Sequence, residues 1–208
     1  MQTVRYKLIE FFIIFILLPV SFALSYPVVI KMILGIVGFI YVIFILLRIE
    51  KNKFKVNPNL RWRRFWKTTM IKLILIAILT ILFIWVSNRE SLFIVICNKP
   101  LLWVMILFVY SLFSVYPQEL LYRTFYFQRY KVLFKSEALF IFINAIVFSL
   151  AHLFFKNTLV LLMTFLGGIL FALTFRNTKS TVLVSIEHAI YGCWLFTVGM
   201  GEMLGFPS

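Results

Sequence analysis

Long apolar runs, each close to the length of a bilayer-spanning helix, follow one another through almost the whole chain. Of its 208 residues, 63% are hydrophobic, and the mean hydropathy is +1.02. A soluble domain of this size contains about half apolar residues, and one helical span needs about 20 of them. The sequence therefore predicts an all-α fold, a polytopic transmembrane helical bundle of about seven spans. The predicted spans are residues 8–26, 28–47, 68–86, 101–130, 137–155, 158–175 and 180–198.

Basic residues dominate the charged ones and lie mainly in the loops between these runs. The formal net charge is +14, from 21 Lys and Arg against 7 acidic residues. In a soluble protein this excess would suggest a nucleic-acid partner, but the sequence contains no soluble domain to support one. Cytoplasmic loops of membrane proteins carry an excess of Lys and Arg. With residues 48–67 in the cytoplasm, fifteen basic residues fall on that side and four on the other. The N-terminus is thus predicted to be cytoplasmic and the C-terminus to lie on the far side.

The second half of the 48–67 loop has an amphipathic pattern. At helical spacing, Trp62, Phe65 and Trp66 share one face. The opposite face carries the basic residues Arg61, Arg63, Arg64 and Lys67. This layout is typical of an interfacial helix, with aromatic rings in the headgroup region and cations facing lipid phosphates. We therefore expect one interfacial amphipathic helix that contacts anionic headgroups of the lipid bilayer; the alternative is a solvated basic loop.

No internal repeat or low-complexity segment divides the chain, so we expect a single membrane-embedded domain at residues 1–208. Residues 1–99 hold the N-terminal spans and the basic loop, and residues 100–200 place polar side chains inside apolar runs. The two cysteines, Cys97 and Cys193, are too few for a disulfide framework or a thiolate metal site.

Four side chains that are costly inside a membrane lie within residues 100–200. Glu119 and Arg123 are four residues apart in the stretch 117–123 (PQELLYR), so they share a helix face and can form an ion pair. His152 and His188 are the only histidines in the chain, and both lie in apolar runs. Ionisable residues within spans are rare and usually functional.

Three of these groups are predicted to reach a similar depth. At about 1.5 Å per helical residue, Glu119 lies about 16 Å, His152 about 22 Å and His188 about 12 Å from the cytoplasmic end of its span. All three therefore fall in the middle of a hydrocarbon core about 30 Å thick. Three separate spans thus bring ionisable groups to one level, which predicts a shared site. The alternatives are an ion pair that serves packing alone and histidines bonded to backbone carbonyls.

Helical spacing relates further residues to the histidines. Asn144, Phe148 and His152 follow at i, i+4 and i+8, so they form one stripe, and His188 and Gly192 are i and i+4. We interpret Asn144 as a helix–helix contact and Phe148 as a packing residue. A glycine at position 192 is expected to leave room for a substrate or a neighbouring backbone.

The order and spacing of these residues resemble the three-motif signature of the CPBP family of intramembrane proteases (CAAX protease and bacteriocin-processing, also called Abi). That signature is written Glu-Glu-x-x-x-Arg, Phe-x-x-x-His and His-x-x-x-Asn/Asp. The corresponding motifs in this chain are Gln118-Glu119-x-x-x-Arg123, Phe148-x-x-x-His152 and His188-x-x-x-Gly192. The resemblance covers about residues 100–200. It implies a multi-span helical protease, expected in a bacterial plasma membrane, that cleaves a membrane-associated peptide or protein.

The resemblance also implies roles for individual side chains. Gln118 stands where the family has the Glu usually taken as the base, and an amide cannot accept a proton near neutral pH. Glu119 is therefore expected to act as the base, held ionised by Arg123, while Gln118 orients a water or donates to an oxyanion. His152 is expected to bind the same water, and His188 to polarise the scissile carbonyl.

Gly192 replaces the Asn or Asp that is thought to help hold the oxyanion in the family. A divalent metal such as zinc is an alternative to a directly activated water, because two neutral histidines and a carboxylate form a known catalytic zinc set. Its ligands would be His152, His188 and Glu119.

Three function classes follow from the sequence. The first is an intramembrane endopeptidase. The second is a catalytically silent relative that binds a membrane partner or confers immunity, to which Gln118 and Gly192 point. The third is a bis-histidine haem carrier or a small transporter.

Overall fold

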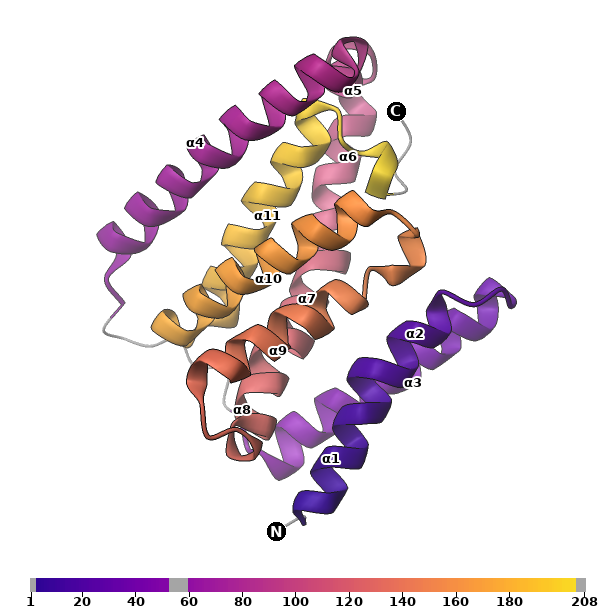
Figure 1. The fold of residues 1–208 in the computed structure, drawn as a ribbon, viewed down its shortest axis with the longest axis vertical. Coiled ribbons are helices and arrows are strands. Elements are labelled where there is room, and N and C mark those ends of the chain that lie inside the picture. Colours follow the sequence, from indigo (N-terminus) through magenta and orange to yellow (C-terminus); the bar gives the residue numbers. More distant parts are fainter. Residues whose placement is uncertain (1–2, 53–59, 205–208) are drawn as a thin grey trace. The chain divides into compact units, whose positions relative to one another are not determined.

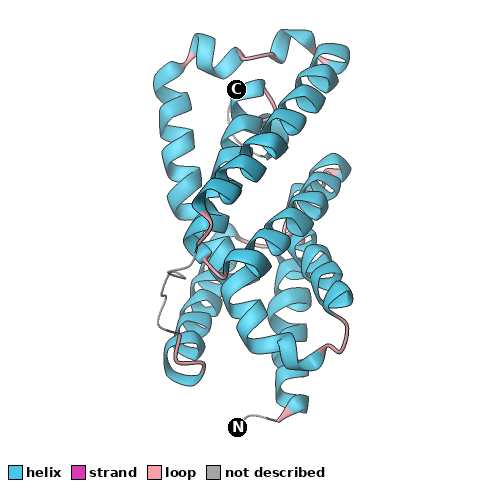
Figure 2. Cartoon of the chain, turned by 90° about the vertical axis from the view of Figure 1, so that its left-hand side faces the viewer, coloured by secondary structure: helices cyan, strands magenta, loops and turns pink. Residues whose placement is uncertain are grey.

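The computed structural model describes residues 3–52 and 60–204, which are helical almost throughout and contain no strand (Figure 2). Within these residues, six helices are long and apolar enough to cross a membrane. They are Val28–Ile49, Trp62–Ser87, Pro100–Leu133, Glu137–Phe155, Thr158–Thr178 and Thr181–Val198. The prediction of an all-α transmembrane bundle is confirmed, and the chain is an integral membrane protein.

The first predicted span, residues 8–26, is not among these six helices. Residues 4–22 form three successive segments: α1 (Val4–Phe12), the π-helix η1 (Ile13–Leu17) and α2 (Leu18–Phe22). Arg5, Lys7 and Glu10 lie in the first of them, so this helix is more highly charged than an ordinary span. The described part of the chain thus has six candidate spans where about seven were predicted.

The chain forms two compact units, each built from two separate stretches of sequence. The first unit comprises Met1–Lys55 and Gln118–Asn177, and the second comprises Val56–Pro117 and Thr178–Ser208. The short helix α7 (Tyr116–Glu119) contains the boundary between them. The single-domain organisation, with its regions 1–99 and 100–200, stays a prediction.

The first unit contains α1, η1 and α2, two further elements of its first stretch, and the helices of its second stretch. The further elements are α3 (Val28–Phe44), η2 (Ile45–Ile49), η5 (Leu120–Phe125), α8 (Tyr126–Tyr130), η6 (Lys131–Leu133), α9 (Glu137–Leu150), η7 (Leu153–Phe155) and α10 (Thr158–Thr178). Its core is rich in aromatic rings: the Phe15 ring packs edge-on against Tyr122, Tyr126 and Tyr130 at centroid distances of 5.4, 5.5 and 5.7 Å. Edge-to-face packing of this kind is favourable beyond the burial of area.

Helices α9 and α10 lie side by side in this unit (Figure 1). A Cβ added at Gly168 of α10 would lie 3.0 Å from the Cα of Ala145 in α9. Small residues allow such close backbone contact between membrane helices.

A buried polar network ties α1, α3 and α8 of the first unit together. Arg129 is only 1% exposed, and its guanidinium donates to Glu10 Oε2 at 2.7 Å and to Glu50 Oε1 at 2.8 Å. Tyr41 and Tyr130 donate their hydroxyls to the two oxygens of Glu10, at 2.5 and 2.9 Å. Arg129 is one of the fifteen basic residues predicted on the cytoplasmic side, and its side chain is buried because it pairs with Glu10 and Glu50.

The second unit is built around α11 (Thr181–Val198). Its other elements are α4 (Trp62–Ser87), η3 (Arg89–Ser91), α5 (Ile94–Asn98), α6 (Pro100–Val109), the π-helix η4 (Tyr110–Val115) and η8 (Glu202–Leu204). Val95, Ile106 and Phe196 form a core, against which Trp103 and Tyr110 pack. Helix α11 ends at Gly199, whose φ of +106° and close approach to Ser91 exclude a side chain.

Residues 62–67 do not form a separate interfacial helix. They are the first turns of α4, which continues without a break to Ser87, because no Gly or Pro interrupts this stretch. Trp62 and Trp66 are exposed, as an interfacial role requires, whereas Phe65 is 7% exposed and packs against Trp66. The predicted segment is therefore the start of a spanning helix, and Phe65 belongs to its packed side.

Candidate functional site

Glu119 and Arg123 form the predicted ion pair inside the first unit. Both side chains are fully buried, and Arg123 Nε lies 3.2 Å from Glu119 Oε2. Between them the chain changes from α7 to the π-helix η5. Short π-helical segments within helices occur frequently at functional sites.

Asn144 of α9 fixes the position of Arg123. The Nη1 group of Arg123 donates to Asn144 Oδ1 at 2.7 Å, and Asn144 Nδ2 donates to the backbone carbonyl of Tyr122 at 2.7 Å. Asn144 is fully buried, and a buried amide whose groups are satisfied in this way orders its neighbours. Its role is thus wider than the expected helix–helix contact, because through Arg123 it also positions Glu119.

Phe148, expected only to fill space, lies against the side chains of two motifs. The Arg123 guanidinium is 4.7 Å from the centroid of the Phe148 ring, a cation–π distance. The same ring lies 5.0 Å from the His152 ring. The Arg of the first motif and the His of the second are therefore connected through this phenyl ring.

His152 follows the end of α9, which stops at Leu150. Its Nδ1 lies 2.8 Å from the carbonyl oxygen of Phe148, one of the last helical carbonyls, which need partners from outside the helix. A carbonyl only accepts hydrogen bonds, so Nδ1 carries the proton and Nε2 the lone pair. The bond was expected of a structural histidine, and it is also how proteins orient a histidine that binds a metal or water.

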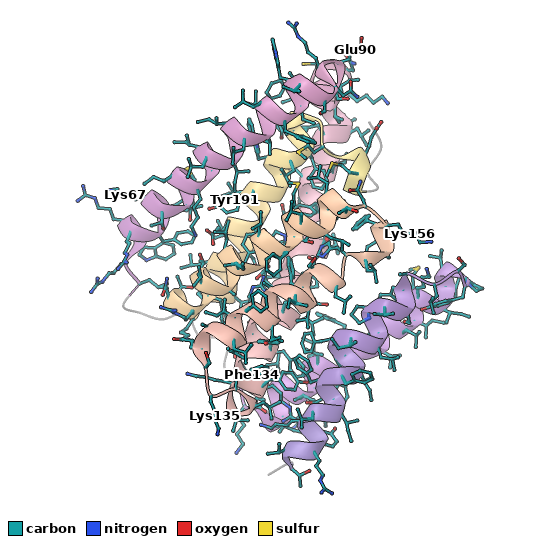
Figure 3. The ribbon with its side chains drawn as sticks, viewed as in Figure 1. Lys67, Glu90, Phe134, Lys135, Lys156 and Tyr191 are labelled. Carbon is teal, nitrogen blue, oxygen red and sulfur yellow. The ribbon has the colours of Figure 1, made fainter. Side chains whose placement is uncertain are left out.

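His188 lies on α11 of the second unit and is 6% exposed. The preceding residue, Glu187, is fully buried and accepts from Lys72 Nζ at 2.8 Å. Tyr191 lies on the same helix (Figure 3). Its hydroxyl lies 2.9 Å from Glu187 Oε1 and 3.1 Å from the carbonyl of Thr69. These contacts hold α11 against α4 and so fix the helix that carries His188.

Gly192 does not leave room for a substrate, because Tyr110 fills the space. A Cβ built at Gly192 would lie 2.1 Å from the Tyr110 hydroxyl oxygen, far closer than real side-chain contacts. The Tyr110 ring also packs edge-on against His188, at a centroid distance of 6.0 Å. Sequence reasoning missed Tyr110, since helical spacing relates only residues of the same helix.

The structure thus joins some of the predicted site residues directly. Glu119 contacts Arg123, and His152 is connected to Arg123 through Phe148, all in the first unit. Gln118 is half-buried and precedes Glu119 on α7. His188 belongs to the second unit, and its convergence with Glu119 and His152 stays a prediction.

The metal set of Glu119, His152 and His188 also stays a prediction. Among the residues that the structure describes, no three or more His, Cys, Asp or Glu side chains within one unit are grouped to hold a metal ion.

These observations define a multi-span helical membrane protein with a buried carboxylate–guanidinium pair and two histidines on well-anchored elements. The family model "Type II CAAX prenyl endopeptidase Rce1-like" matches residues 100–194, which include all three motifs. The match covers a little under half of the chain and confirms the resemblance to the CPBP family. At the level of the family, this part of the chain is similar to CAAX-type proteases. Neither the comparison with curated proteins nor that with solved structures found a match.

Proposed function

We propose that the chain is an intramembrane endopeptidase that hydrolyses a peptide bond of a membrane-associated substrate with an activated water. The observation that carries this proposal is the fully buried Glu119–Arg123 pair, held by Asn144 inside the region that matches the protease family. Charged groups at such depth are costly, so a pair that is also precisely positioned suits a chemical role. The family match also favours proteolysis over the haem-carrier and transporter alternatives.

In the proposed reaction Glu119 acts as general base. It takes a proton from a water, whose oxygen bonds to the scissile carbonyl carbon while the carbonyl electron pair moves to oxygen. The C–N bond then breaks, the proton on Glu119 passes to the leaving nitrogen, and a carboxyl group and an amine result. His152, with its Nε2 lone pair, accepts a hydrogen bond from the same water, and His188 polarises the carbonyl.

Arg123 and Gln118 support the base in this scheme. The guanidinium of Arg123 pairs with the Glu119 carboxylate and holds it in position. Gln118 offers an amide that orients the water. The proposed reaction uses no metal, because the Glu119 carboxylate already pairs with Arg123 at 3.2 Å. If zinc were bound, His152, His188 and Glu119 would hold it. The zinc ion, and not these side chains, would then activate the water.

The substrate class is proposed from the name of the matched family, the type II CAAX prenyl endopeptidases. A prenylated peptide that ends in a CAAX sequence is therefore the first candidate. An unprenylated peptide of a membrane protein is the second.

A catalytically silent relative is the other candidate function, and one specific residue favours it. Gln118 stands at the position of the family's usual base, and its amide cannot take up a proton at neutral pH. In that case the buried Glu119–Arg123 pair would serve packing, and the chain would bind a membrane partner without cleaving it.

The test measures cleavage of both candidate peptides by the chain in proteoliposomes. We expect Glu119→Gln and His152→Ala each to lower kcat by about 10²–10⁴-fold, since each removes a group that handles the reacting water. Gln118→Glu is expected to raise kcat, and Glu90→Gln, at an exposed position, serves as the matched control. Activity should survive a zinc chelator.

Three results would contradict parts of this proposal. If Glu119→Gln cleaves at the wild-type rate, Glu119 is not the base. Absence of cleavage in both the wild type and Gln118→Glu would leave the silent relative as the better description. Loss of activity with chelator, restored by zinc, would replace the metal-free scheme.

A further inference from the structure

Tyr110 occupies the position that a side chain at residue 192 would take. The hydroxyl oxygen of Tyr110 lies 2.1 Å from an ideal Cβ at Gly192, and the ring atoms Cε1 and Cζ lie 2.4 Å from it. Since real Cβ atoms do not approach so closely, no residue other than glycine fits there while Tyr110 keeps this position. The second unit thus carries a polar oxygen at this point of α11, although residue 192 itself has no side chain.

The Tyr110 ring packs against His188, a residue with an assigned catalytic role. Gly192 is one helical turn beyond His188, on the same face of α11. The Tyr110 ring packs edge-on against His188, at a centroid distance of 6.0 Å, and against Phe196, at 4.7 Å. These two residues precede and follow Gly192 on α11. Contacts on both sides hold the ring in one orientation, so its hydroxyl is positioned before any substrate arrives.

A tyrosine hydroxyl suits the stabilisation of an oxyanion. It keeps its proton at neutral pH and can donate it in a hydrogen bond, and donors fixed in advance at the site of developing charge lower the barrier most. In the first unit, Arg123 already donates to Asn144 and pairs with Glu119. A donor beside His188 would add to the polarisation of the carbonyl that the proposed reaction assigns to His188.

Several contacts attach the helix of Tyr110 to α11. Trp103 Nε1 of α6 donates to Thr197 Oγ1 of α11 at 2.9 Å, and Ser111 Oγ lies 3.5 Å from Cys193 Sγ. These two contacts and the ring contacts of Tyr110 remain in a variant that lacks only the hydroxyl.

We propose that the Tyr110 hydroxyl is a catalytic residue that donates a hydrogen bond to the oxyanion formed beside His188, at the position that Gly192 leaves to it. This inference rests on the proposed endopeptidase function. It assigns to a residue of η4 the task that a side chain at position 192 would otherwise perform.

The decisive variant is Tyr110→Phe, which removes the hydroxyl and keeps the ring. We expect kcat to fall by about 10²–10³-fold, the usual loss for one oxyanion donor, with KM unchanged. A peptide analogue with a tetrahedral phosphinate should lose affinity for Tyr110→Phe by a similar factor, whereas the uncleaved peptide should not. Tyr116→Phe, at an exposed tyrosine a few residues further along, should keep the wild-type kcat.

A double substitution tests whether a side chain at position 192 can replace the Tyr110 hydroxyl. Gly192→Asn alone should unfold the second unit or inactivate the chain, because the new side chain meets the Tyr110 ring. The double variant Tyr110→Ala with Gly192→Asn has space for the amide and should exceed Tyr110→Ala in kcat. If Tyr110→Phe does not fold, the kcat of the double variant relative to that of Tyr110→Ala tests the proposal instead.

The failure of this inference and that of the proposed function are distinguishable. Wild-type kcat in Tyr110→Phe, or an equal loss in Tyr116→Phe, would overturn the role of the hydroxyl and leave the endopeptidase in place. A double variant no better than Tyr110→Ala would overturn it as well. If the wild type and Gln118→Glu cleave neither peptide, both proposals fall together.

Discussion

At the scale of single residues, the arginines Arg129 and Arg176 of the first unit both pair with glutamates but lie in very different surroundings. Arg129 is 1% exposed and binds Glu10 and Glu50, whereas Arg176 and Glu137 are 41% and 58% exposed and lie 3.7 Å apart. Removing one side of a buried pair leaves an uncompensated charge in a medium that solvates it poorly. Water and salt screen an exposed pair, so its loss matters little.

We therefore expect Arg129→Met to lower the free energy of unfolding by about 3–5 kcal/mol. Arg176→Met, the matched control, should lower it by about 0–1 kcal/mol. Both values can be measured by denaturant titration of the chain in mixed micelles. Equal effects of the two substitutions would show that the Glu10–Arg129–Glu50 network does not stabilise the first unit.

Residues within one helix could be paired from the sequence, and residues far apart could not. The i, i+4 spacing predicted the Glu119–Arg123 pair, which the structure contains. It gave no sign of the Glu10–Arg129 contact or of Tyr110 at Gly192, because these join different helices. A glutamate inside the first apolar run was the one available signal, since a carboxylate there needs a counter-charge.

At the scale of elements, both prolines inside the apolar runs follow a π-helical segment. Pro19 lies at the start of α2, directly after η1, and Pro117 lies in α7, directly after η4. Proline has no N–H for the carbonyl four residues earlier, and its ring crowds that carbonyl. A proline inside an apolar run predicts an irregularity in the helix at that position. The sequence could not predict π-helical turns, because their hydrogen-bond pattern depends on the surrounding packing.

The start of α4 carries the next prediction, which concerns the lipid partner proposed for this segment. Replacing Arg61, Arg63, Arg64 and Lys67 by Gln should abolish the rise in Tm that phosphatidylglycerol produces over phosphatidylcholine. Each basic residue near an anionic surface contributes about 1 kcal/mol. Phe65 is left unchanged because it is buried.

The control for this experiment is the double variant Lys99→Gln with Lys156→Gln, whose lysines are predicted to lie on the far side of the membrane. It should keep the response to the anionic lipid. An unchanged Tm rise in the α4 variant would mean that these cations do not contact headgroups.

At the scale of the whole molecule, orientation in the membrane is predicted from the distribution of basic residues. Lys135 precedes α9 and Lys156 follows it, so the two exposed lysines lie near opposite ends of this helix (Figure 3). The charge bias places Lys135 in the cytoplasm and Lys156 on the far side.

In a chain with Cys97→Ser and Cys193→Ser, we expect Lys135→Cys to react with an impermeant maleimide only after the membrane is opened. Lys156→Cys should react in intact cells. Reaction of both from outside would contradict the span at α9, and a reversed result would invert the predicted topology.

Hydropathy predicted the membrane-embedded helices well and their grouping poorly. All six predicted spans from residue 28 onward overlap the observed helices. The helix predicted at 68–86 begins earlier, at Trp62, and the one predicted at 101–130 continues to Leu133. The units, in contrast, each combine two distant stretches of sequence. An apolar run indicates that a segment leaves water, but not whether its side chains face lipid or another helix. It therefore carries no information on which helices are neighbours.

The contacts of Arg123 have a consequence for how such a protein can change in evolution. Asn144, Phe148 and Glu119 all touch this one guanidinium, so a substitution at any of them removes a contact of a buried charge. The first two motifs are therefore expected to change together. Position 192 is not constrained in this way, because the Tyr110 side chain from another helix occupies the space beside it. The third motif can thus lose its side chain while the first two remain locked to each other.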